Sequence, residues 1–352
     1  MRTVFFIPPL AKGSGGLGTI YELAEILLRQ GHRVAITVPS SADSAQQDFL
    51  SHLDQDIERL PWNNLTTDSG ILGPGDIWCV PESWPNALAP GLKAGARVLI
   101  YVQSWIYLLG VLPQDVKWRQ LPVEYLAVSQ PVNWFLRELC GVNARDILPP
   151  AVHPDFFSTA RAVATATGTT PERIRIAWMP RKNKALSGQI QNIAGLCLDQ
   201  EAEKIPVEFV EIHSLKRPEV ARLMSDVDIF LCTGFPEGFS LPPLESMAVG
   251  CVPVGFSGLG GFEYMRNPDN SPLPGLHTPP FTQEKKNWGA NGFFVADGDV
   301  LSAGRALARA IKLAYTGGSE WENLRCNARL TAEAYSLEKR EETVRRIWSG
   351  LT

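Results

Sequence analysis

The feature that most constrains the fold is a repeated alternation of short apolar runs with segments of helical periodicity. The apolar runs that we interpret as strands lie at 3–7, 34–38, 76–80, 97–103 and 124–128, and again at 174–179, 207–212, 228–232, 251–256 and 292–295. Helical periodicity is found in the second series at 185–199, 217–225, 242–249, 302–315 and 319–334. Continuously apolar strands are typical of parallel sheets covered on both faces, and strands alternating with helices build such sheets. The sequence therefore predicts an α/β protein with two doubly wound, Rossmann-like domains.

The domain boundaries follow from length and local composition. The 352 residues are enough for two domains, each with its own core. Residues 158–173 are small, polar and rich in Thr and Ala, as in an interdomain linker. We therefore predict an N-terminal domain over 1–157 and a C-terminal domain over 174–335. Residues 266–290 are rich in Pro, Asn and Gly and predict a long surface loop.

Composition excludes several classes of protein. Hydrophobic content of 45% and charged content of 20% are typical of globular proteins, and a net charge of −4 argues against a nucleic-acid partner. The six cysteines have no paired spacing, which favours free thiols in a reducing cytosol. We recognise no signal peptide, and the longest apolar stretch, 98–113, is interrupted by Gln103 and Ser104. These features predict a cytoplasmic location without a transmembrane segment, with peripheral membrane association left open.

The segment 237–254 carries the strongest indication of function. Glu237 and Glu245 lie eight residues apart around a helix start that Pro242 and Pro243 favour. A helix N-terminus attracts phosphate, and carboxylates accept hydrogen bonds from hydroxyl groups. A nucleotide sugar, which has a diphosphate and sugar hydroxyls, fits both features. The alternative is that Glu237 caps the helix and Glu245 is a solvated acid of its first turn.

The whole string EGFSLPPLESMAVG, residues 237–250, resembles the E-x7-E signature of retaining glycosyltransferases of the GT-B fold, especially family 4. Ser240 stands where glycine is more usual. The resemblance implies two Rossmann-like domains facing across a cleft, with residues 336–352 forming a last helix that returns to the N-terminal domain. It implies transfer of a sugar from a nucleotide-diphosphate sugar to a hydroxyl acceptor, without metal or cofactor. The acceptor would be a glycan, a lipid-linked molecule or a small molecule.

The resemblance also implies roles for individual residues. Glu237 would contact the transferred sugar and stabilise positive charge at its anomeric carbon, and Glu245 would bind the ribose hydroxyls. The predicted catalytic residues are Glu237, Arg181 and Lys182, and the predicted donor-binding residues are Gly15, Gly16, Gly238, Phe239, Ser240, Leu241 and Glu245. No protein nucleophile is expected, because the departing phosphate assists the incoming hydroxyl on the same face.

The basic segment 179–184, MPRKNK, follows the first strand of the second domain. Ligands of α/β sheets bind at the carboxyl ends of strands, so Arg181 and Lys182 are placed to neutralise a diphosphate. In the family a lysine follows the arginine by five residues, whereas here the lysines come sooner. Lys184 is therefore an alternative to Lys182, and a solvated charge cluster is the alternative to both.

The N-terminal loop contains the pattern G-x-G-x-x-G at Gly13, Gly15 and Gly18. This pattern favours a dinucleotide site, but the acid expected about 20 residues later, at the end of the next strand, is absent there, and Asp43 comes too late. In the family, Gly15 and Gly16 let the loop approach the donor diphosphate. A tight turn alone is the structural alternative.

Three further residues are candidates. Many family members have a histidine at the end of an N-terminal strand, where this chain has Gln103, which could substitute as a hydrogen-bonding group. His213 either lies near the base or sugar or simply ends a strand. Trp105, between Tyr101 and Tyr107, predicts an acceptor site on aromatic rings, although a buried core strand is an equal alternative.

Two D-x-D triplets, Asp226–Asp228 and Asp297–Asp299, could suggest a metal. The first opens an apolar strand, and the second resembles a turn in which Asp299 caps a helix, so we assign neither to a metal. The alternatives to a transferase are a GT-B sugar-nucleotide epimerase or phosphorylase, or a non-catalytic nucleotide-sugar-binding protein.

Overall fold

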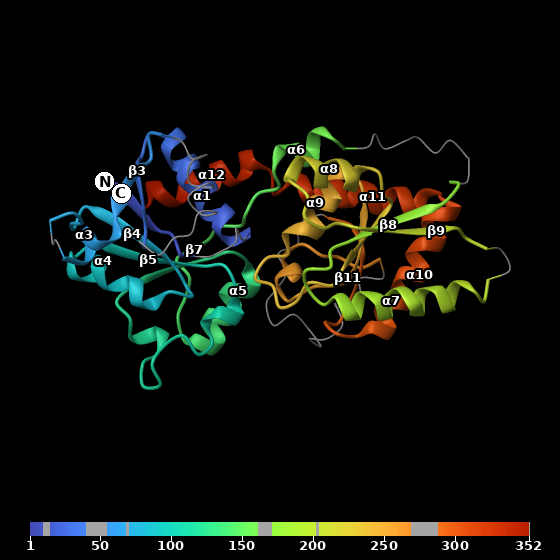
Figure 1. Ribbon diagram of the computed structural model, residues 1–352, viewed down its shortest axis with the longest axis horizontal. Coiled ribbons are helices and arrows are strands. Elements are labelled where there is room, and N and C mark those ends of the chain that lie inside the picture. The colour runs from blue at the N-terminus through green and yellow to red at the C-terminus, as the bar shows by residue number, and fades with distance from the viewer. Residues whose placement is uncertain are drawn as a thin grey trace. The chain divides into compact units, whose positions relative to one another are not determined.

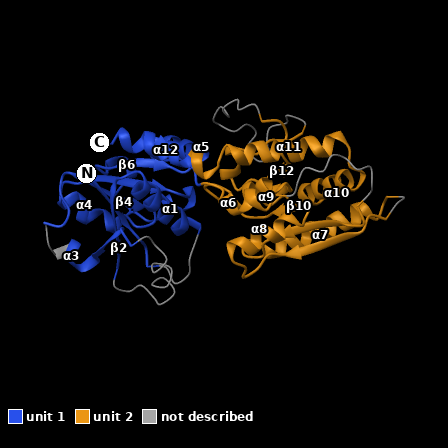
Figure 2. Ribbon diagram, turned by 90° about the horizontal axis from the view of Figure 1, so that it is seen from above, with its two compact units in different colours: residues 1–150, 340–352 blue, residues 151–339 orange. Residues whose placement is uncertain are grey.

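A computed structural model describes residues 1–9, 15–39, 55–67, 70–160, 171–201, 204–268 and 288–351 (Figure 1). The chain divides into two compact units, residues 1–150 with 340–352 and residues 151–339 (Figure 2). Each unit contains one parallel sheet. Gly13 and most of the predicted loop 266–290 lie outside the described residues.

Unit 1 is built on a seven-stranded parallel sheet in the order β3-β2-β1-β4-β5-β6-β7. Its strands are β1 (Arg2–Phe6), β2 (Arg33–Val38), β3 (Glu58–Pro61), β4 (Asp76–Pro81), β5 (Arg97–Val102), β6 (Glu124–Ala127) and β7 (Asp146–Ile147). The α-helices described in unit 1 are α1 (Gly15–Arg29), α3 (Trp62–Thr67), α4 (Ala89–Lys93), α5 (Gln130–Phe135) and most of α12 (Leu337–Ser349). The five strands predicted from apolar runs are confirmed. Strands β3 and β7 were not predicted, because neither is an apolar run of the sequence.

Unit 2 has a five-stranded parallel sheet in the order β12-β11-β10-β8-β9. Its strands are β8 (Ile174–Trp178), β9 (Val207–Glu211), β10 (Ile229–Cys232), β11 (Val252–Phe256) and β12 (Phe293–Val295). Its helices are α6 (Pro154–Ser158), α7 (Lys184–Leu198), α8 (Arg217–Ser225), α9 (Leu241–Val249), α10 (Val300–Thr316) and α11 (Ser319–Glu333). Helices α7 and α10 pack together on one face of the sheet, and α8, α9 and α11 lie on the other (Figure 1). All five strands and five helices predicted for this region are confirmed.

The division between the units falls at Pro150 and Ala151, seven residues before the boundary expected from the sequence. The reason is α6, which packs on α8 and α9 of unit 2 although it precedes the polar segment 158–173. Near the C-terminus the division falls between Lys339 and Arg340, so the first residues of α12 belong to unit 2.

The remainder of α12 is fixed to unit 1 by buried side chains. Arg340, which is 3% exposed, donates to the carbonyl oxygens of Pro149 at 2.6 Å and Thr19 at 2.9 Å. Trp348 is fully buried and its Nε1 donates to Thr3 Oγ1 at 3.0 Å. A buried charged group needs such partners, so this end of the chain is an integral part of unit 1.

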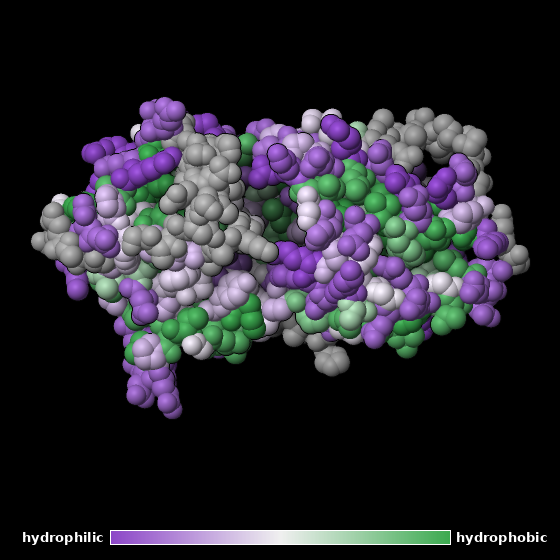
Figure 3. Space-filling model, viewed as in Figure 1, coloured by the Kyte–Doolittle hydropathy of each residue, from purple (hydrophilic) through white to green (hydrophobic). Residues whose placement is uncertain are grey.

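Three further properties are the polarity of the surface, the lengths of the apolar helices and the state of the cysteines. On the face shown in Figure 3, the surface of the described residues is mostly hydrophilic, with apolar patches between the hydrophilic side chains. No helix in the described part of the chain is both long enough and apolar enough to span a membrane. All six cysteines are free thiols, as their spacing predicted.

Candidate functional site

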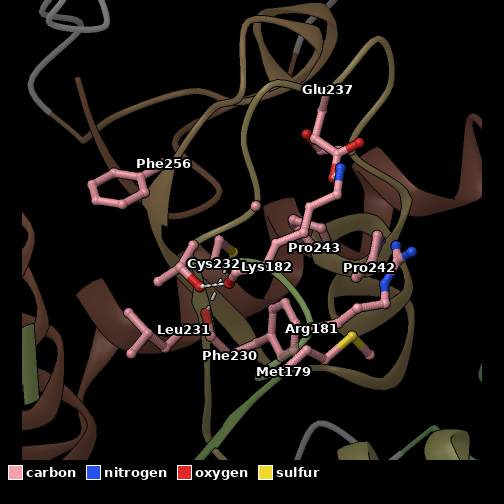
Figure 4. Close-up of a pocket in the computed structure, with 13 residues that line it drawn as sticks. Met179, Arg181, Lys182, Phe230, Leu231, Cys232, Glu237, Pro242, Pro243 and Phe256 are labelled. Carbon is pink, nitrogen blue, oxygen red and sulfur yellow. Dashed lines mark hydrogen bonds and ion pairs between the residues drawn. The ribbon is translucent and has the colours of Figure 1, made fainter. Parts of the chain in front are cut away.

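A pocket opens at the carboxyl edge of the sheet in unit 2. It is lined by residues that follow β8, by the end of β10 and by the start of α9 (Figure 4). The lining residues are Met179, Arg181, Lys182, Phe230, Leu231, Cys232, Thr233, Gly234, Glu237, Ser240, Pro242, Pro243 and Phe256. The pocket therefore brings Glu237 together with Arg181 and Lys182, the other two residues predicted to be catalytic, which lie more than 50 residues earlier in the sequence.

An ion pair dominates the pocket. Lys182 Nζ lies 2.7 Å from Glu237 Oε1 and 3.3 Å from the carbonyl oxygen of Pro236. The two side chains are 34% and 24% exposed, so both are half-buried and still reachable by solvent. Figure 4 shows the lysine stem crossing the pocket toward the carboxylate. A charged hydrogen bond of this length fixes the orientation of the Glu237 carboxylate.

Arg181 differs from Lys182 because no described residue holds its guanidinium group. The residue is exposed and makes no hydrogen bond or ion pair with any residue that the structure describes. A guanidinium group has five N–H donors in a planar fork that matches phosphate oxygens. This arginine is therefore available to a bound anion.

The loop carrying these two cations is fixed by a residue between them and α7. Asn183 is left-handed, with φ of 57°, and its Nδ2 donates to the carbonyl oxygen of Thr233 at 2.7 Å. Thr233 Oγ1 in turn donates to the Lys182 carbonyl oxygen at 3.3 Å. Asparagine tolerates this backbone conformation better than most residues, so the sequence PRKN suits the sharp turn from β8 into α7.

Glu237 is held by backbone pairing with a glycine-containing segment. Its N–H donates to the Gly258 carbonyl oxygen at 2.8 Å, and its own carbonyl oxygen accepts the Gly260 N–H at 3.0 Å. Gly258 has φ of +66°, and a Cβ there would lie 2.9 Å from the Cβ of Glu237. A Cβ at Gly260 would lie 2.4 Å from the Gly238 carbonyl carbon. Glycine is thus required at both positions for the close approach.

Helix α9 begins at Leu241, with Ser240 as its N-cap residue. Glu245 is therefore in the second turn, which corrects the expectation that it lies in the first. Pro242 and Pro243 have no N–H to offer a ligand. The amides of Phe239, Ser240 and Leu241 donate to no acceptor among the described residues, so the N-terminus of this helix retains donors for an anion.

The side chains of two predicted donor-binding residues, Phe239 and Ser240, make contacts within the protein. Ser240 Oγ donates to the Ser257 carbonyl oxygen at 3.0 Å, and the hydroxyl of Tyr264 donates to the Ser240 carbonyl oxygen. The Phe239 ring packs against Tyr264 and Tyr335, with centroids 5.6 and 5.4 Å away. Phe239 and Ser240 can contribute backbone N–H groups to a ligand, whereas their side chains stabilise the loop.

Glu245 is half-buried and does not line the pocket. Burial raises the pKa of its carboxyl group to about 7, although the positive charge of Arg217 opposes this shift. The carboxyl group has no hydrogen-bond partner among the described residues, and it can accept hydrogen bonds from hydroxyl groups.

Two other candidates lie away from the pocket. Lys184 is exposed, with its Nζ 3.9 Å from Glu211 Oε2. His213 is exposed and its Nδ1 lies 3.0 Å from Ser214 Oγ. Neither residue lines the pocket, so the geometry favours Lys182 over Lys184 as the neighbour of Glu237.

In unit 1 the structure places Gly15 and Gly16 in the first turn of α1 rather than in the preceding loop. A Cβ at Gly15 or Gly18 would meet no atom within 4 Å, so the described protein leaves space beside them. Tyr101 is fully buried and donates to the Leu148 carbonyl oxygen at 2.7 Å, which makes it a core residue. Trp105 is half-buried, with its ring centroid 5.5 Å from that of Phe135.

Sequence reasoning missed Glu82, which follows β4 and is 2% exposed. Its Oε1 accepts the Ser104 N–H at 2.9 Å, and the amides of Gln103 and of Glu82 itself also donate to this carboxyl group. Burial raises its pKa to about 7, although the three amides oppose the shift. The sequence did contain a signal for this residue. Glu82 comes directly after a predicted strand, and Gln103 lies at the end of another predicted strand, so both could have been expected at the same edge of the sheet.

The D-x-D triplets form hydrogen bonds within the protein. Asp228 accepts the Arg175 N–H at 3.0 Å, and Asp299 caps α10 by accepting the Ser302 N–H at 2.9 Å, as predicted. Asp297 accepts the Gly258 N–H at 2.8 Å. In the described ranges, no group of three or more His, Cys, Asp or Glu residues could hold a metal ion.

The chain is similar to an alpha-1,6-glucosyltransferase of Actinobacillus pleuropneumoniae serotype 7 (strain AP76), with 31% identity over 187 residues. This match covers 52% of the chain and 53% of the relative, so the chain spans about half the length of the curated relative that it matches. No protein-family model matches the sequence.

Solved structures match nearly the whole chain. Sucrose-phosphate synthase from Thermosynechococcus elongatus has a TM-score of 0.68 at 14% identity, covering 99% of this chain and 98% of that one. The pneumococcal O-GlcNAc transferase GtfA, in complex with UDP and GlcNAc, has a TM-score of 0.60 at 10% identity, again covering 99% and 98%. The fold is GT-B. The predicted class, α/β with two parallel-sheet Rossmann-like domains, is thereby confirmed, and both the relative and these structural neighbours are glycosyltransferases.

Proposed function

We propose that this protein is a retaining glycosyltransferase that moves a sugar from a nucleotide-diphosphate sugar to a hydroxyl acceptor without a metal ion. The single observation that carries the proposal is the pocket in unit 2, which is lined by a fixed carboxylate, by a guanidinium group without a partner among the described residues, and by Ser240, the N-cap residue of α9. The fold and the similarity to a glucosyltransferase support this reading.

The donor diphosphate binds Arg181, Lys182 and the amides of Phe239, Ser240 and Leu241. These groups supply two positive charges and the partial positive charge of a helix N-terminus, which together match a diphosphate. They are also able to stabilise the negative charge that develops on the leaving group, which is the task that a metal ion performs in other transferases. Glu245, whose carboxyl group accepts no hydrogen bond from a described residue, binds the ribose hydroxyls.

Glu237 stabilises the reacting sugar. Its carboxylate is fixed by Lys182 and by backbone pairing with Gly258, so its negative charge is held in place beside the diphosphate site. As the bond between the anomeric carbon and the diphosphate breaks, the carbon becomes positively charged. The acceptor oxygen then bonds to this carbon on the same face, and the acceptor proton passes to the departing phosphate oxygen. A carboxylate that acts on the charged transition state accelerates this step more than it tightens binding.

The first test is transfer by the intact chain with a panel of nucleotide sugars. UDP-glucose and UDP-GlcNAc are tested first. The curated relative is named a glucosyltransferase, and the structure of GtfA contains UDP and GlcNAc. We expect an α-linked product from an α-linked donor, seen as the anomeric configuration by NMR, and full activity in excess EDTA. A β-linked product would exclude retention, and loss of activity in EDTA that Mg²⁺ or Mn²⁺ reverses would exclude the metal-free mechanism.

The same assay separates the alternatives. An epimerase would change the nucleotide sugar in the absence of any acceptor, and a phosphorylase would release sugar phosphate from a glycan and inorganic phosphate. A non-catalytic binding protein would bind nucleotide sugars in a thermal-shift experiment, with no product from any donor. A donor at 100 times its Kd should raise the free energy of unfolding by about 2.7 kcal/mol, so binding is readily detected.

A further inference from the structure

The segment that pairs with Glu237 is itself held by an aspartate that the proposed reaction does not use. Gly258 accepts the Glu237 N–H through its carbonyl oxygen at 2.8 Å, and its own N–H donates to Asp297 Oδ1 at 2.8 Å. One glycine therefore links the carboxylate of Asp297 to the backbone of Glu237 through two short hydrogen bonds. The amide of Ser257 also donates to the Asp297 carboxylate.

The contact between Gly258 and Glu237 leaves little room for movement. At its φ of +66°, Gly258 has a backbone that a side chain would strain, and a Cβ there would lie 2.9 Å from Glu237 Cβ and 2.9 Å from the Gly234 carbonyl oxygen. A shift of Gly258 would act on Glu237 through the hydrogen bond between the two backbones, and the Gly260 N–H holds the Glu237 carbonyl oxygen on the other side. The position of Gly258 sets the position of the Glu237 backbone.

Asp297 is well placed to fix that position. It follows β12, the strand that pairs with β11, and β11 leads into Ser257 and Gly258. The two amides of the segment thus donate to a carboxylate from the neighbouring strand end. The residue is the first member of the second D-x-D triplet, whereas Asp299, the other member, caps α10. The two aspartates of the triplet therefore have different roles: Asp297 accepts the Gly258 N–H, and Asp299 caps α10.

We propose that Asp297 is a positioning residue for Glu237, acting through Gly258 and Ser257. A group that stabilises a transition state must be held within a fraction of an ångström of its productive place, and hydrogen bonds from surrounding residues provide this restraint. The inference rests on the proposed function for its kinetic consequence, while its structural consequence can be measured without any reaction.

The test compares Asp297→Ala, Asp297→Asn and Asp299→Asn in the full chain. Asparagine keeps a side-chain oxygen that can accept the Gly258 N–H, whereas alanine removes the acceptor. Asp299→Asn is the matched control, because it removes the same charge two residues away and asparagine still caps a helix. All three proteins are first compared by circular dichroism and thermal unfolding, and only folded variants are measured.

The structural readout is amide hydrogen exchange in peptides that cover residues 234–260. We expect Asp297→Ala to speed exchange of the Glu237 and Gly258 amides at least 10-fold, with much smaller changes in the other two variants. Exchange that is unchanged in Asp297→Ala would overturn the inference whether or not the protein is a transferase. Equal acceleration in Asp297→Asn and Asp297→Ala would also overturn it, because the hydrogen bond would then not be the cause.

The kinetic readout separates positioning from donor binding. If the wild-type protein transfers sugar, kcat should fall at least 10-fold in Asp297→Ala and less than 3-fold in Asp297→Asn, with the Kd for the nucleoside diphosphate within 2-fold of wild type. Equal losses in kcat and in nucleotide affinity would contradict a role through Glu237. Absence of transfer by the wild-type protein would count against the proposed function alone, since hydrogen exchange decides the positioning role.

Discussion

The carboxyl edges of the two sheets use glutamate in opposite ways. At the edge in unit 2, Glu237 is partly exposed and is paired at 2.7 Å with Lys182, next to Arg181, which has no partner among the described residues. At the edge in unit 1, Glu82 is 2% exposed and its carboxyl group accepts the backbone amides of Glu82 itself, Gln103 and Ser104. One edge leaves charged side chains partly exposed to solvent, and the other uses a buried carboxyl group to hold its own loops.

The comparison shows that topology alone does not make a site. Both sheets are parallel, and parallel strands bring their carboxyl ends and the following loops to one edge. In unit 2 the loop after β8 supplies two cations, so the carboxylate has a charged partner and stays accessible. In unit 1 the described loops after β4 and β5 give Glu82 no charged partner, and its carboxyl group accepts hydrogen bonds from buried amides instead.

The largest expected effect is on Glu237. Glu237→Gln keeps the shape of the side chain but removes the charge beside the developing cation, so kcat should fall about 10²- to 10³-fold, as when one preorganised stabilising group is lost. The Kd for donor should change little, because the charge matters mainly in the transition state. Steady-state kinetics and calorimetry measure the two quantities.

Glu211→Gln, an exposed glutamate of the same unit, is the control and should leave both quantities unchanged. Glu245→Gln should show the reverse pattern, with weaker donor binding and a nearly normal kcat. If Glu237→Gln weakened donor binding and Glu245→Gln reduced turnover, the two predicted roles would have to be exchanged.

The second effect concerns the stability of unit 1. The folded-state pKa of Glu82 is raised from 4.5 to about 7, so the folded chain binds more protons than the unfolded chain between these values. The contribution of Glu82 to stability is therefore greatest below pH 4.5, falls as the pH rises, and is lost above about 7. A shift of this size corresponds to at most about 3 kcal/mol.

Comparison with Glu82→Gln isolates this contribution. The free energy of unfolding of wild type minus that of the variant should fall by up to about 3 kcal/mol between pH 5 and pH 8, measured by urea denaturation. Glu138→Gln, which removes an exposed glutamate of unit 1, is measured over the same pH range as the control. A pH-independent difference for Glu82→Gln would mean that Glu82 is ionised throughout and that the two edges are more alike than their burial indicates.

Much of the fold was predictable because its signals are local. Helix α9 was predicted at 242–249 and found at Leu241–Val249, because proline, apolar periodicity and a glycine cap all lie within the segment. Strand β3, with exposed Glu58 and Arg59, has no apolar run and could not be predicted in this way. Its place at the sheet edge depends on pairing with β2, which lies far before it in the sequence.

The residues of the candidate site could be proposed from the sequence, whereas most of their contacts could not. The resemblance identified Glu237, Arg181 and Lys182, which the pocket brings together. It did not indicate that Lys182 pairs with Glu237, because 54 residues separate them and the contact depends on the order of β8 and β10 in the sheet. The same limit explains Glu82, whose partners Gln103 and Ser104 follow a neighbouring strand.

The third effect is on donor binding at the edge in unit 2. Arg181→Ala should weaken binding of a nucleoside diphosphate by about 1.5–3 kcal/mol, the range for a hydrogen bond to a charged group. The guanidinium group has no described protein partner, so its removal should not destabilise the fold. Lys184→Ala is the matched control, because this exposed lysine lies outside the pocket and its loss should leave affinity unchanged. Calorimetry that found equal effects for the two variants would favour a general effect of charge over a specific site.

The smallest effect tests whether the edge in unit 1 also binds a substrate. Trp105 is half-buried against Phe135 with ring centroids 5.5 Å apart, and it follows the Gln103–Ser104 segment that Glu82 holds. If its exposed part contacts the acceptor, Trp105→Ala should raise the acceptor KM several-fold and leave donor affinity unchanged. The lost ring contact should also lower the free energy of unfolding by about 0.5–1.5 kcal/mol.

Trp105→Phe separates these effects, because a phenyl ring can keep the contact with Phe135 while presenting less surface to an acceptor. We expect Trp105→Phe to restore most of the stability but only part of the acceptor KM. If both variants lost stability in proportion and the acceptor KM stayed normal in the folded fraction, Trp105 would belong with Tyr101 to the core of unit 1.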